Sequence, residues 1–76
     1  MPVAYVLLNV ELGSEDDVLK ELKNLNEVKE AHRVYGVYDT IVKVQAETTE
    51  KLKEIVSWKI RRLPNVKSTL TMIALE

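Results

Sequence analysis

The residues best suited to chemistry gather in one short stretch of the chain, residues 34–44, which reads VYGVYDTIVKV. Gly36 tolerates a positive φ and Asp39 is a common turn former, so together they predict a hairpin connection. Tyr35 and Tyr38 go beyond what a turn requires, because such rings suit places where one end is buried and the other finds a polar partner. The stretch is therefore a candidate binding site as well as a candidate turn.

Two threonines near the C-terminus are a second candidate. Thr69 and Thr71 are two residues apart in a predicted strand, so their hydroxyls project from the same face, although threonine is also simply a good strand residue. His32 is the single histidine and the chain has no cysteine, so we predict no metal centre. A catalytic acid or base with a partner is also missing, which predicts no catalytic residue, no cofactor and no enzymatic activity.

Length and composition limit the partners of the chain. Seventy-six residues predict a single domain, residues 1–76, with a thin core that association with a second copy would complete. A net charge of −1 argues against nucleic-acid binding, and the basic cluster Lys59, Arg61 and Arg62 is predicted to complement the C-terminal end of a helix. Because no apolar run approaches the ~20 residues that cross a bilayer, we predict no membrane span and a cytoplasmic location.

Hydrophobic periodicity predicts the order β-α-β-β-α-β. Residues 3–12 alternate as a strand covered on both faces, and Ser14 with Asp17 resembles the capping box of a first helix. Thr48 or Thr49 can cap a second helix, and Pro64 is expected to end it. The other predicted strands cover residues 28–35, 38–46 and 66–75.

With short connections and right-handed crossovers, this order predicts an α+β, ferredoxin-like βαββαβ sandwich. Its four-stranded antiparallel sheet carries both helices on one face and leaves the other face bare. Tyr5, Leu7 and Ile41 are predicted to lie on that bare face, where an apolar patch marks an interaction surface. We therefore expect two copies to pack sheet to sheet into a dimeric α+β barrel, with these three residues in the dimer interface.

Residues and order together resemble the RAM domain, the amino-acid-sensing part of the Lrp/AsnC transcription regulators. Four segments carry the likeness, which spans nearly the whole chain: LNEVKEAHRVYG, the hairpin GVYD leading into TIVKV, IRRLPNV, and STLTMIAL. The resemblance implies dimers that associate into rings such as octamers and bind small effectors between dimers. Full-length members place a helix-turn-helix domain ahead of this module, so the chain resembles a stand-alone RAM domain without a DNA-binding domain, which could join full-length regulators in mixed assemblies.

The resemblance also implies an effector pocket. Its ligand-binding residues would be Tyr35, Gly36, Val37, Tyr38 and Asp39, completed across a dimer–dimer boundary by Thr69 and Thr71. In such a pocket the backbone N–H groups around the glycine would bind the carboxylate of an amino acid, and the aspartate and threonine oxygens would accept from its ammonium. A small dimeric α+β barrel enzyme and a structural adaptor for full-length regulators are the alternative functions.

Overall fold

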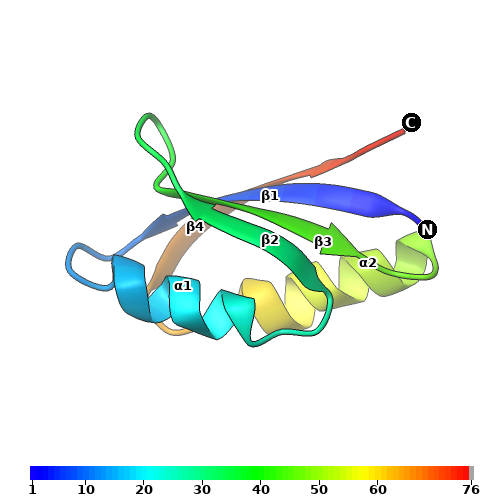
Figure 1. Ribbon diagram of the computed structural model, residues 1–76, viewed down its shortest axis with the longest axis horizontal. Coiled ribbons are helices and arrows are strands. Elements are labelled where there is room, and N and C mark those ends of the chain that lie inside the picture. The colour runs from blue at the N-terminus through cyan, green and yellow to red at the C-terminus, as the bar shows by residue number, and fades with distance from the viewer. Residues whose placement is uncertain (76) are drawn as a thin grey trace.

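The structure, a computed structural model, describes residues 1–75 and contains one antiparallel sheet with helices on one face (Figure 1). The strand order is β2-β3-β1-β4, and every neighbouring pair is antiparallel. This is the predicted ferredoxin-like βαββαβ sandwich, so the fold prediction is confirmed. The elements are β1 (Val3–Val10), α1 (Glu15–Lys23), β2 (Val28–Arg33), β3 (Thr40–Gln45), α2 (Thr49–Ile55), η1 (Val56–Ile60), a π-helical turn that continues α2, and β4 (Val66–Ile73).

The core lies between the helices and the sheet face that they cover. Ala4, Val6 and Leu8 alternate along β1 and are fully buried, as the sequence pattern predicts. Residues paired directly across strands share a face, so the partners of Val6, which are Val42 on β3 and Thr71 on β4, point to the helix side as well. The helical segments contribute the buried side chains of Val18, Leu22, Leu52, Ile55, Val56 and Ile60.

The opposite face of the sheet carries an apolar patch, and no helix within residues 1–75 lies over it. Tyr5 is exposed there, while Leu7 and Ile41 are half-buried because each is flanked by side chains of neighbouring strands. On β4, Leu70 pairs with Leu7 and Met72 pairs with Tyr5, so both belong to the same patch. We call the surface formed by Tyr5, Leu7, Ile41, Leu70 and Met72 the open face.

The two helix starts differ in how they are capped. The Oγ1 of Thr48 accepts a hydrogen bond from the Lys51 N–H at 3.1 Å, which confirms one of the two predicted caps. The predicted capping box at Ser14 is wrong, since the ψ of 5° at Ser14 departs from extended backbone and its side chain makes no capping hydrogen bond. Instead, Oε1 of Glu15 accepts the N–H of Gly13 at 2.9 Å.

The strands are shorter than predicted because the loops take residues from their ends. β2 ends at Arg33 and β3 begins at Thr40, so residues 34–39 form a loop rather than a tight turn. The second helical segment ends at Ile60, before Pro64 is reached. Asn65 follows the proline with a φ of 71° and directs the chain into β4.

Candidate functional site

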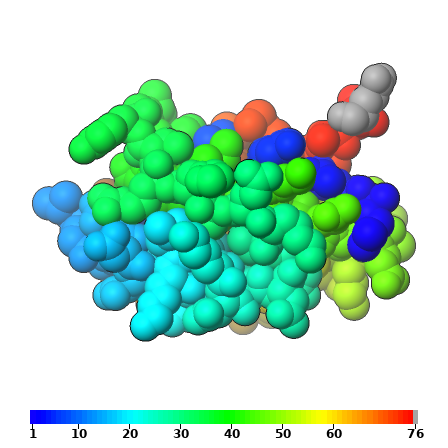
Figure 2. All heavy atoms as spheres, in the orientation of Figure 1, coloured from blue at the N-terminus to red at the C-terminus, as the bar shows by residue number. Residues whose placement is uncertain are grey.

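The loop of residues 34–39, which joins β2 to β3, extends away from the helices at one end of the sheet (Figure 1). In the space-filling view it stands out beyond the neighbouring surface (Figure 2). The side chains of Tyr35 and Val37 reach solvent, since these residues are 106% and 84% exposed. Gly36 has a φ of 145°, a backbone conformation that glycine adopts without strain, so the positive φ predicted for it in the connection between β2 and β3 is confirmed.

Tyr35 carries an aromatic ring and Val37 an isopropyl group, and both groups are exposed in the loop. Neither side chain is held by the core of the same chain. Exposed apolar groups on a protruding loop favour contact with another molecule.

Asp39 fastens this loop to β1. Its backbone N–H donates to the Leu8 carbonyl at 2.9 Å, and its Oδ2 accepts from the Val10 N–H at 3.2 Å. The Val34 N–H closes the base of the loop by donating to the Asp39 carbonyl at 2.9 Å. One carboxylate oxygen is thus engaged within the chain, a contact that the sequence pattern did not predict.

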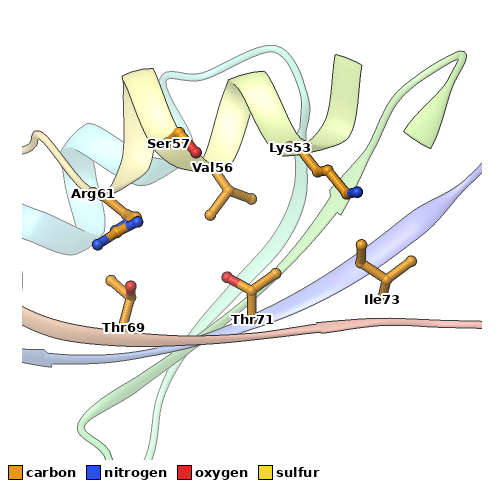
Figure 3. A pocket seen from close by; sticks show the side chains of 7 residues that line it. All are labelled: Lys53, Val56, Ser57, Arg61, Thr69, Thr71 and Ile73. Carbon is orange, nitrogen blue, oxygen red and sulfur yellow. The ribbon is translucent and has the colours of Figure 1, made fainter. Parts of the chain in front are cut away.

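Thr69 and Thr71 lie on β4, at the edge of the sheet opposite β2. Their partners on β1 are Leu8 and Val6, so both threonines project toward the helices. They line a cavity of about 400 Å³ between β4 and the α2–η1 segment (Figure 3). The complete lining is Lys53, Val56, Ser57, Arg61, Thr69, Thr71 and Ile73. We call this cavity the β4 pocket.

Within one chain, the two predicted halves of the site do not meet. Tyr35 and Asp39 line a different cavity of about 330 Å³, together with Glu15, Arg33 and Val34. No residue of the 34–39 loop lines the β4 pocket. A single site formed by both halves would therefore need the loop of a second chain.

Sequence reasoning missed Lys53, Ser57 and Arg61 as pocket residues. They are four residues apart, a spacing that places side chains on one side of a helix, and that spacing was the available signal. Figure 3 shows all three on the side of the helical segment that faces β4. From the sequence alone, Arg61 is interpreted only as a charge that complements a helix end.

The π turn supports this alignment. The Arg61 N–H donates to the Val56 carbonyl at 2.9 Å, five residues back, as in a π-helix. In an α-helix, four residues exceed one 3.6-residue turn, so positions four apart drift around the axis. A wider turn offsets that drift between Ser57 and Arg61. Such π turns are often found at functional sites.

Two other kinds of site are not found in the part of the chain that the structure describes. Residues 1–75 contain no group of three or more histidine, cysteine, aspartate or glutamate side chains placed to hold a metal ion. None of their helices is long and apolar enough to cross a membrane.

Comparison with known proteins agrees with the fold. The structure of FFRP-DM1 superposes with a TM-score of 0.95 at 43% identity, covering 99% of this chain and 100% of that one. The Lrp/AsnC ligand binding domain model matches residues 3–76. The fold is thus that of a small α+β domain, and the chain belongs to the Lrp/AsnC ligand-binding domain family.

Three further relatives show where such domains occur. The HTH-type transcriptional regulator FL11 of Pyrococcus abyssi is 31% identical over 74 residues, which are 97% of this chain and 48% of that protein. The chain thus spans about half the length of this curated relative. A feast or famine regulatory protein of M. tuberculosis, complexed with L-methionine, is 25% identical with a TM-score of 0.82, covering 100% of this chain and 51% of that one. Homocitrate synthase of Saccharolobus islandicus is 41% identical over 59 residues, 78% of this chain but 13% of the enzyme.

Proposed function

We propose that this chain is an effector-binding module that assembles through its open face and binds a small amino acid where two dimers meet. The observation that carries the proposal is the β4 pocket, a polar-lined cavity at a sheet edge in a domain of a ligand-binding family. The M. tuberculosis relative supports an amino acid as the effector, because its structure is a complex with L-methionine.

The open face supports assembly into dimers. Tyr5, Leu70 and Met72 expose 38%, 43% and 48% of their surface on a sheet face that no helix covers. A contiguous apolar patch of this kind in a chain of 76 residues is typical of an interaction surface. Packing two such faces together forms the dimeric α+β barrel, and further association of dimers forms a ring such as an octamer.

In this proposal the loop of one dimer covers the β4 pocket of another. Backbone N–H groups around Gly36 donate to the amino acid's carboxylate at close range, because glycine has no Cβ to obstruct it. The Asp39 carboxylate, with the hydroxyls of Thr69 and Thr71, accepts from the ammonium group. Tyr35, Val37 and Tyr38 exclude water from the ligand.

The module is proposed to act in transcription regulation or amino-acid metabolism. FL11 is a transcriptional regulator, and the match within homocitrate synthase shows that a similar segment also occurs in an enzyme. We propose no catalysis and no direct DNA contact by these residues, since the net charge is −1 and the pocket lacks a paired acid and base. Full-length regulators of the same family are candidate partners in mixed assemblies.

A thermal-shift screen of the twenty amino acids tests the proposal. A ligand that binds only the folded state raises the melting temperature, and at a hundred times its Kd it adds about 2.7 kcal/mol to the free energy of unfolding. We expect one or a few L-amino acids to raise the melting temperature, with their D-enantiomers as controls. A flat result for all twenty would contradict effector binding and favour the structural adaptor.

Asp39→Asn tests the proposed ammonium contact. The variant keeps a side-chain oxygen that can accept from the Val10 N–H, so the loop stays fastened while the negative charge is lost. Loss of a charged hydrogen bond should weaken binding of the effector about tenfold in isothermal titration. Val37→Ala, at the exposed loop tip, is the variant in which binding should change less. Unaltered affinity in Asp39→Asn would exclude the carboxylate from the site.

A further inference from the structure

We propose that the β4 pocket selects an acidic ligand, namely an amino acid whose side chain ends in a second carboxylate. This inference rests on the proposed function and narrows its ligand class. It starts from the charges around the cavity, where Lys53 and Arg61 are both lining residues and no acidic side chain among residues 1–75 lines it.

The two cations lie toward opposite ends of the pocket. In Figure 3, Arg61 is near Thr69 at one end and Lys53 is near Ile73 at the other, with Val56 and Thr71 between them. Their separation of eight residues corresponds to a rise of about 12 Å along an α-helix. When both long side chains turn inward, their charged groups come closer together than this, so a short ligand can contact both. Two cations placed in this way suit a ligand with a carboxylate at each end.

Within residues 1–75, neither Lys53 nor Arg61 forms an ion pair. The four ion pairs in that part of the chain use Lys43, Lys59, Arg33 and His32 as their basic partners. Lys53 and Arg61 are in none of them. Their charges are therefore available to an anion that enters the pocket.

Hydroxyl groups line the space between the cations. Thr69 and Thr71 occupy helix-facing positions of β4, directly beside Leu8 and Val6 of the fully buried core. On β3, the corresponding positions are Val42 opposite Val6 and Thr40 opposite Leu8, and Thr40 is buried in the core away from the pocket lining. Thr69 and Thr71 are the hydroxyl-bearing residues of the sheet that line the pocket. Each hydroxyl can donate to a carboxylate oxygen while its lone pairs accept from the ammonium group, as in the proposed function.

The remaining lining residues fit the rest of such a ligand. Val56 and Ile73 are apolar and can contact the methylene groups between two carboxylates. The ammonium group is repelled by Lys53 and Arg61, so it would face the loop of the neighbouring chain, where Asp39 is placed by the proposed function. Acidic amino acids match this distribution of charge better than neutral ones.

Isothermal titration with matched ligand pairs tests this inference. L-glutamate is compared with L-glutamine, and L-aspartate with L-asparagine, because each pair differs in one charge at nearly constant shape. We expect an acidic amino acid to bind at least about tenfold more tightly than its amide. Lys53→Gln and Arg61→Gln should each reduce that ratio severalfold. The ratio is the readout, because it is insensitive to a change that weakens both ligands equally.

The chain offers a control for each variant. Lys51 is exposed on α2 and Arg62 stacks over the Trp58 ring at 4.1 Å, and neither lines the pocket. Lys51→Gln and Arg62→Gln remove the same charge and should leave the ratio unchanged. Equal effects in pocket and control variants would overturn the inference, as would an amide that binds as tightly as its acid.

The outcomes also separate this inference from the proposed function. Binding of neutral amino acids alone would overturn acidic selectivity and leave an amino-acid effector in place. Binding of neither acidic nor neutral amino acids would overturn both. Inorganic sulfate that competes as well as glutamate at equal concentration would show a general anion site and overturn selectivity for an acidic amino acid.

Discussion

Single side chains connect parts of the fold that are distant in sequence. Lys59 Nζ donates to Glu27 Oε2 at 3.0 Å and so joins η1 to the turn before β2. The pKa of Glu27 lies below its ordinary value of 4.5, and this hydrogen bond contributes most to the lowering. Similarly, the Asp39 carboxylate accepts a hydrogen bond from the Val10 N–H, 29 residues away in the sequence. Such contacts could not be predicted from local pattern, because they depend on which loops the fold brings together.

The Glu27 contact predicts a pH dependence. Because the pKa of Glu27 is lower in the folded state, its stabilisation is present above pH 4.5 and is lost as the pH falls through the folded-state pKa. Lys59→Met should lower the free energy of unfolding by about 0.5 kcal/mol at pH 7 and by less at pH 3, since the pair is partly exposed. Urea unfolding at fixed protein concentration measures this.

Lys67→Met removes an exposed lysine on β4 and is the control for lost charge. The difference in unfolding free energy between Lys67→Met and the wild type should not become smaller at low pH. A difference between Lys59→Met and the wild type that stays constant from pH 7 to pH 3 would contradict an ionised Glu27 as the source of the effect.

At the scale of elements, apolar periodicity was a reliable guide to the core. The predicted stripe of the second helix, which includes Leu52, Ile55 and Ile60, is buried as expected. The π turn was not predicted, because apolar residues spaced three and four apart are also typical of a regular α-helix. The pocket residues on that segment were missed for a related reason: their polar spacing gains meaning only once β4 is known to lie opposite.

The two helix starts predict different sensitivities to mutation. Thr48→Ala removes the oxygen that accepts from the Lys51 N–H and should cost about 1 kcal/mol of unfolding free energy. Ser14→Ala should cost much less, because the Ser14 side chain makes no capping hydrogen bond. Thermal or urea unfolding of both variants compares them directly. Equal losses would mean that the side-chain cap at Thr48 contributes little.

At the scale of the whole molecule, the sequence alone predicted the sheet and its bare face correctly. Alternation in β1 indicated two covered sides, and the helices cover one of them. Leu70 and Met72 were not assigned to this face from the sequence, because the alternation in residues 69–72 does not say which side of the strand the helices cover. The candidate site was harder to predict, since its two parts lie apart within one chain.

A charge in the open face should weaken assembly. Leu7 lies between Ile41 and Leu70 at the centre of the open face, so Leu7→Lys would place an ammonium group in an apolar interface. We expect the dimer to dissociate at least about tenfold more readily, which sedimentation equilibrium measures. Leu12→Lys changes a residue that is 95% exposed outside this face and should leave assembly intact. Similar association constants for both variants would place the interface elsewhere.

Native mass spectrometry of the purified chain, with and without the amino acid that most raises the melting temperature, tests assembly and effector binding together. It reports the number of subunits and the number of bound ligands in one spectrum. We expect an assembly with an even number of 8.7 kDa subunits, whose mass increases by whole multiples of the mass of the amino acid. A bare monomer, or an assembly to which no amino acid binds, would contradict it.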